Sequence, residues 1–143
     1  MFPVDVAELD AAETLAATVR TRAQEKQLGV DRLVLAVHYA DLHPSPAMVP
    51  GDQTVPGRER GLIYGGPGCP GVAEFAVAEY GAVSGVTPES AAKDIGQALA
   101  LRHRMPLTWD QVLAGEATAW KARLIATACL GLSLDAAAVV DRR

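Results

Sequence analysis

The chain has 143 residues, which suits one domain or a small domain with an appended arm. Half of the residues are hydrophobic but only 5% are aromatic, and a core of alanine, valine and leucine favours closely packed helices. The net charge of −4 argues against nucleic-acid binding over the whole surface, because such affinity comes largely from neutralised phosphates. Any contact with nucleic acid must therefore come from local basic patches.

Cysteine usage and the N-terminus indicate a cytoplasmic protein. Cys69 and Cys129 lie far apart and form no CxxC pair, a usage that fits a reducing compartment. The first residues lack the basic region of a signal peptide. No apolar run reaches the roughly eighteen residues of a transmembrane helix, so no membrane contact is expected.

Residues 1–43 predict a helical hairpin. A capping box from Asp5 to Glu8 starts the first helix, and Gly29 ends it. One apolar stripe runs along this helix and comprises Leu9, Ala12, Ala16, Val19 and Ala23. A second helix covers about residues 31–43 and stops at Pro44. The hairpin is interpreted as a packing or self-association element.

Residues 44–71 predict a linker or a long surface loop. Six prolines and seven glycines fall in this stretch and prevent a regular element of any length. Its one apolar run, residues 61–65, is expected to lie against a neighbouring element. The chain is thus divided into a hairpin (1–43), a linker (44–71) and a helical block (72–143).

The helical block opens with a helix-turn-helix-like pair. The first helix covers about residues 72–84, and Gly85 permits a tight turn. Thr87 as N-cap and Pro88 at the first helical position start the second helix. Its apolar stripe comprises Ala92, Ile95 and Leu99.

Three further helices are predicted after this pair. Their expected starts are Thr108, in a capping box with Gln111, then Thr118 and Ser133. Gly115 and Gly131 are expected to end the first two. The last helix reaches Arg143 without a capping glycine, which is interpreted as a truncated helix.

The helix-turn-helix pattern predicts contacts with duplex DNA. The N-terminal half of such a second helix enters the major groove, where Ser90, Lys93 and Gln97 would reach phosphates or base edges. Glu89 and Asp94 would repel phosphates. The alternative is an ordinary helical corner, since bent helix pairs are common without DNA.

A second set of basic residues supports the same hypothesis. Arg102 and Arg104 lie at the end of the second helix, and Lys121 and Arg123 lie near the start of a later one. The alternative is a solvated face, with the two arginines at the negative end of their own helix. The candidate DNA-binding residues are Ser90, Lys93, Gln97, Arg102, Arg104, Lys121 and Arg123.

No catalytic residue, cofactor or metal site is expected. His38, Asp41, His43 and His103 show no recurring ligand spacing. Cys69 lies in a Gly/Pro loop, where packing is favoured over reactivity.

The chain resembles domain-of-unknown-function family 222 over nearly its whole length. The resemblance is carried by Ala40-Asp41-Leu42-His43-Pro44, Gly66-Pro67-Gly68-Cys69-Pro70, Val72-Ala73-Glu74-Phe75, Ala78-Glu79-Tyr80-Gly81-Ala82, Ala98-Leu99-Ala100-Leu101-Arg102-His103-Arg104-Met105-Pro106 and Trp120-Lys121-Ala122-Arg123. It implies the N-terminal part of an actinobacterial protein with an HNH endonuclease signature. Members of the family usually carry the nuclease in a later C-terminal module, and this sequence contains no HNH arrangement. The helical block also resembles, in layout, the central region of ParB-type partition proteins.

These observations predict an all-α protein with a hairpin, a Pro/Gly linker and a helical bundle. The predicted function is a non-catalytic, DNA-engaging domain of the HNH-endonuclease-associated type. The alternative is a protein-interaction module that self-associates through the N-terminal hairpin and binds no DNA.

Overall fold

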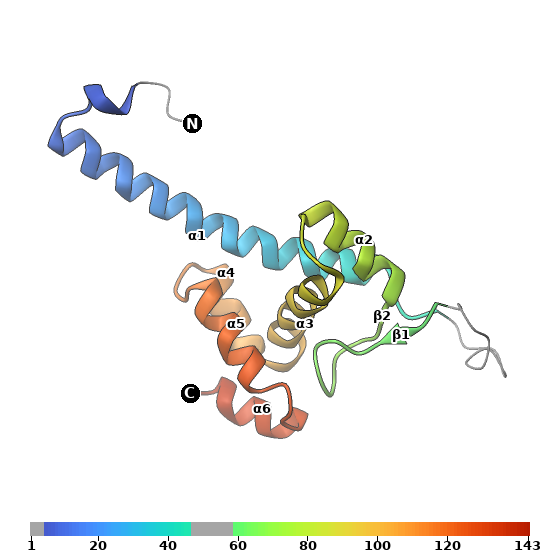
Figure 1. The fold of residues 1–143 in the computed structure, drawn as a ribbon. Helices are drawn as coiled ribbons and strands as arrows, with labels where there is room; N and C mark the ends of the chain where they lie inside the picture. Colours follow the sequence, from blue (N-terminus) through green and yellow to red (C-terminus); the bar gives the residue numbers. More distant parts are fainter. Residues whose placement is uncertain (1–4, 47–58) are drawn as a thin grey trace, which may run out of the picture.

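The computed structural model describes residues 5–46 and 59–143 and is all-α, as predicted (Figure 1). A short 3-10 helix, η1 (Val6–Glu8), precedes the long helix α1 (Ala11–Leu42). The other helices are α2 (Glu74–Ser84), α3 (Pro88–Arg104), α4 (Pro106–Leu113), α5 (Ala119–Ala128) and α6 (Leu134–Asp141). In the described residues no helix has an apolar stretch of the length needed to cross a bilayer.

The predicted N-terminal hairpin is wrong, because residues 11–42 form one continuous helix. Its capping box uses Asp10, whose carboxylate accepts from the backbone N–H of Glu13 at 2.7 Å, whereas Asp5 caps only η1. Gly29 does not end the helix. A Cβ at Gly29 would lie 3.2 Å from Cβ of Ala119, so the glycine allows close packing between α1 and α5.

The segment predicted as a linker is partly built into the fold. Its residues 47–58 lie outside the described residues, but Gly61–Leu62 (β1) pairs antiparallel with Val72–Ala73 (β2). The backbone N–H of Ala73 donates to the carbonyl of His43 at 3.0 Å, which joins β2 to the end of α1. Residues 72–73, predicted to be helical, are therefore in a strand, and α2 starts at Glu74.

Helix α3 lies at the centre of the bundle and contacts α1, α2, α4, α5 and α6. Its start agrees with the prediction, with Thr87 as the N-cap and Pro88 in the first turn. Ile95 and Leu99 are fully buried and Ala92 is half-buried. One hydrophobic core joins the C-terminal half of α1 to the rest of the chain.

The start of α4 differs from the prediction because its cap comes from α6. Asp141 accepts from the backbone N–H groups of Leu107 and Thr108 at 2.9 and 2.8 Å, and from Thr108 Oγ1 at 2.7 Å. Thr108 is thus inside the first turn of α4 and is not its N-cap. Ser133 caps α6 as predicted, while α5 ends at Ala128, before Gly131. A carboxylate remote in sequence has replaced the predicted local cap.

Replacing Gly96 with alanine should destabilise the fold. Alanine adds about 1 kcal/mol of helix propensity, but its Cβ would lie 2.5 Å from the Tyr64 carbonyl oxygen. Overpacking of this kind typically costs about 1–3 kcal/mol. We therefore expect the free energy of unfolding, measured by urea denaturation, to fall by up to about 2 kcal/mol. Gly131→Ala is the control, because its Cβ meets no atom within 4 Å, and an equal loss there would contradict this packing account.

Candidate functional site

Helices α2 and α3 form the tight pair that the sequence predicts. Gly85 adopts φ +75 at the turn, a left-handed conformation that glycine adopts without strain. Gly81 brings the helices together, since a Cβ there would lie 3.0 Å from Cβ of Ala91. Ser90 and Lys93 are exposed in the first two turns of α3. These two residues occupy the positions expected of groove-contacting side chains.

The middle of α3 is enclosed by the bundle. Every residue from Ile95 to Leu101 is buried, because other helices pack around this part of α3. A recognition helix needs an exposed face along its N-terminal half. Here the exposed part is limited to the first two turns.

Gln97 belongs to a polar network inside the fold, so its predicted exposure is wrong. It is 5% exposed and donates from Nε2 to Thr127 Oγ1 at 2.7 Å. Arg123 donates to Gln97 Oε1 at 3.2 Å and lies 3.6 Å from Asp94 Oδ1. Burial lowers the pKa of Arg123, while Asp94 opposes that shift. Both candidates therefore bridge α3 and α5.

Arg104 is 2% exposed, so its predicted exposure is also wrong. Its guanidinium donates to four backbone carbonyls, those of Gly65, Leu130, Cys129 and Leu132, at 3.3, 3.1, 2.9 and 2.6 Å. Three of these carbonyls follow the C-terminal end of α5, where the helix dipole is negative. The charge is thus stabilised by backbone dipoles, and the buried guanidinium is not accessible to a phosphate.

The other candidate residues are exposed but scattered. Arg102, at the end of α3, pairs with Asp41 of α1 at 2.9 Å. Lys121 lies on α5, with its Nζ 5.7 Å from the ring centroid of Trp120. Ser90 and Lys93 lie at the opposite end of α3 from Arg102. The structure therefore does not gather the seven candidates into one basic patch.

Cys69 is buried, and its burial determines the reactivity of its thiol. Burial raises the pKa of its thiol, and the nearby Arg104 opposes this shift. A thiol with a raised pKa is a poor nucleophile, because the thiolate is the reactive form. Within residues 5–46 and 59–143, no three histidine, cysteine or acidic side chains are grouped as metal ligands.

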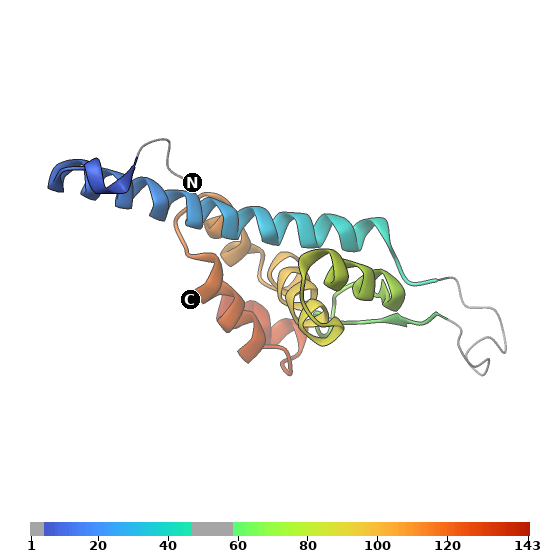
Figure 2. The same cartoon turned by 45° about the horizontal axis from the view of Figure 1, so that its top comes forward.

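The most unusual surface belongs to the N-terminal half of α1. Residues 11–25, here named the arm, extend past the bundle in both views (Figures 1 and 2). Ala17 is the one buried residue of the arm. Lys26, which donates to the carbonyl oxygen of Gly115, marks where the helix meets the bundle. The arm therefore carries side chains that the bundle does not cover.

The arm continues the face of α1 that packs into the core. Ala12, Leu15 and Val19 precede the core residues Val30, Leu33 and Val37 by eighteen positions each, which is five full turns of an α-helix. Leu33 and Val37 are at most 2% exposed, whereas Leu15 and Val19 are 68% and 69% exposed. One apolar stripe thus has a covered half and an uncovered half.

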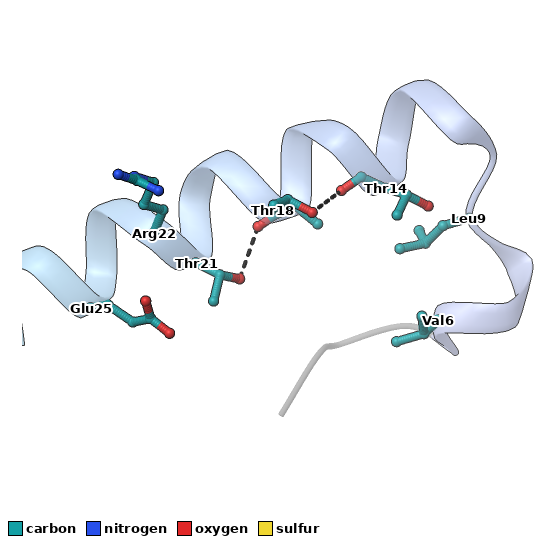
Figure 3. A pocket seen from close by; sticks show the side chains of 8 residues that line it. Val6, Leu9, Thr14, Thr18, Thr21, Arg22 and Glu25 are labelled. Carbon is teal, nitrogen blue, oxygen red and sulfur yellow. Dashed lines mark hydrogen bonds between the residues drawn. The ribbon is translucent and has the colours of Figure 1, made fainter.

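A neighbouring face of the arm is covered by the N-terminal segment. Val6 and Leu9 approach the arm beside Thr14, Thr18 and Thr21, and a groove of about 430 Å³ lies between the two segments (Figure 3). The hydroxyls of Thr18 and Thr21 donate to backbone carbonyls one turn earlier, at 2.9 Å each. These hydroxyls are therefore satisfied within the helix and indicate no polar ligand.

Comparison with known proteins gave no match to a family model, to a curated protein or to a solved structure.

Removing the guanidinium of Arg104 should strongly destabilise the protein. Arg104→Met fills similar volume but leaves two buried and two partly buried hydrogen-bonded carbonyls without these donors, and each unsatisfied buried group costs about 1–3 kcal/mol. We expect a loss of at least about 3 kcal/mol in the free energy of unfolding by chemical denaturation. Arg102→Met is the matched control two residues away, and its exposed pair with Asp41 is worth about 0–1 kcal/mol. Equal losses in the two variants would contradict the assigned role of Arg104.

Proposed function

We propose that this protein is a non-catalytic helical module that self-associates through the arm of α1. The observation that carries the proposal is the uncovered apolar stripe of the arm, in register with the core-packing face of the same helix. Exposed apolar patches of this kind mark interaction surfaces. The occupant we assign to the stripe is a second copy of the chain.

The stability of the arm supports this assignment. Isolated helices of about 12–15 residues are marginal in water, and most helices depend on tertiary packing. Burying a leucine or valine side chain contributes about 1.5–3 kcal/mol. Leu15 and Val19, contributed by each of two copies, would give the arm the packing that its own bundle does not supply.

Engagement of duplex DNA and membership of family 222 stay predictions. The exposed cations among the original candidates are Lys93, Arg102 and Lys121. They lie on two different helices, and Arg102 already pairs with Asp41. Self-association is supported by a continuous surface, so it is the function we favour.

Charged substitutions in the stripe should abolish self-association. Combining Leu15→Glu with Val19→Glu places carboxylates in the proposed interface, and we expect dimer affinity to weaken about a hundredfold or more. Sedimentation equilibrium over a micromolar to submillimolar range measures this change. Val83→Glu is the control, because Val83 is an equally apolar exposed side chain, on α2 and away from the arm. A wild-type protein that stays monomeric throughout this range would refute the proposal.

Duplex DNA should not bind measurably under the self-association proposal. Fluorescence anisotropy of labelled duplex DNA, titrated at low and moderate salt, tests this expectation. If Lys93, Arg102 and Lys121 all contacted phosphates, the logarithm of the affinity would fall with the logarithm of salt with a slope of about −2.7. Binding with such a slope, lost in Lys93→Glu and Lys121→Glu variants, would instead support the DNA hypothesis.

A further inference from the structure

We propose that two arms pair antiparallel, about a two-fold axis level with residue 17 of the arm. This inference rests on the proposed self-association and adds its geometry. Most homodimers are symmetric, and a two-fold interface uses the same surface of each copy. The arm must therefore be complementary to itself, both in its apolar stripe and in the charges beside that stripe.

The apolar stripe is complementary to itself when reversed. An axis level with residue 17 places Leu15 beside the partner's Val19, and Ala12 close to the partner's Ala23. Large side chains then meet near the centre, and small ones lie toward the ends of the overlap. Alanines let helix axes approach closely, to about 8–10 Å. The reversed stripe therefore forms a continuous apolar seam.

The charges beside the stripe favour the same orientation. Glu13 and Arg20 are seven residues apart, so they lie on the same flank of the helix. Antiparallel pairing brings the same flanks of two helices together, so Glu13 of each copy meets the partner's Arg20. The two-fold axis generates this ion pair twice.

A parallel pair would instead bring like charges together. Asp10 and Glu13 make the N-terminal end of the arm acidic. In a parallel dimer these two acidic ends would adjoin, and like charges repel. In the antiparallel dimer each acidic end lies beside residues 20–26 of the other copy. That segment carries Arg20, Arg22 and Lys26 and one carboxylate, Glu25, so its net charge is positive.

The cleft where the arm meets the bundle fits this arrangement. It has a volume of about 370 Å³, and its charged lining residues are Arg22, Lys26 and Glu25, which leaves one net positive charge beside Trp120. Trp120 is 62% exposed, with Lys121 beside its ring. An axis level with residue 17 carries the start of the partner's α1 to about residue 23, at the mouth of this cleft. The cationic cleft and the acidic end are thus complementary in charge.

Disulfide trapping with two single-cysteine additions tests the orientation. Ala12→Cys and Ala23→Cys proteins are oxidised mildly, separately and as a mixture, while native Cys69 and Cys129 are buried. Antiparallel pairing predicts a crosslinked dimer in the mixture and little in either protein alone. Crosslinking of each protein alone, without mixed dimer, would indicate parallel pairing and overturn this inference while leaving self-association standing. A wild-type protein that sediments as a monomer would overturn both.

Charge reversal tests the assigned ion pair independently. Arg20→Glu faces the partner's Glu13, and we expect dimer affinity to fall about tenfold, from two copies of a surface pair. Glu13→Arg should act similarly, with an added local cost because Glu13 belongs to the capping box of α1. Combining both substitutions should recover most of the affinity lost in Arg20→Glu. Additive losses in the combined variant would overturn the pairing of Glu13 with the partner's Arg20.

Discussion

Four backbone carbonyls converge on the buried guanidinium of Arg104, and the C-terminal part of the bundle is organised around this contact. The acceptors come from the loop at Gly65 and from the segment that joins α5 to α6. Gly66 makes the close approach possible, because it adopts φ +92 and a Cβ there would collide with Nη1 of Arg104. A charge taken from water is costly unless its donors are satisfied. The positions of the loop and of α6 are therefore coupled to the end of α3.

Hydrogen bonds and ion pairs within the fold explain why the basic residues form no continuous surface. Arg104 bonds to carbonyls, and Arg123 lies between Gln97 and Asp94. Arg102 pairs with Asp41. These contacts join α3 to its neighbours, so the spaced cations of the sequence serve mainly to hold the bundle together. The helix-turn-helix-like corner is real, but its second helix is the central helix of the core.

Local signals predicted the local structure well, and tertiary contacts account for the failures. Thr87 with Pro88 and Ser133 start helices as expected, because a cap satisfies nearby N–H groups. Thr108 failed as a cap because Asp141, remote in sequence, satisfies the same end of α4. Gly29 failed as a helix end because the glycine is needed for the approach of α5. Packing between remote elements is not encoded in a local pattern.

The burial of Arg104 could not have been predicted from helical periodicity. Arg102 follows Leu99 by three positions and Ala98 by four, just as Arg104 follows Leu101 and Ala100, so the spacing does not distinguish the buried arginine from the exposed one. The arm posed a different difficulty. An apolar stripe that included Ala12 and Val19 but not Leu15 was visible in the sequence. A stripe does not reveal whether its own bundle covers it.

The length of α1 decides how its apolar stripe is used. A hairpin broken at Gly29 would have folded residues 12–23 back onto the chain and covered the stripe within one molecule. The continuous helix instead carries these residues beyond the bundle, so nothing in the described part of the chain packs on Leu15 and Val19. Gly29, which the sequence predicted to end a helix, lies at the contact with Ala119. It therefore allows the long helix to pack closely on the bundle. The packing that leaves the arm uncovered is thus the same packing that makes it available to a second copy.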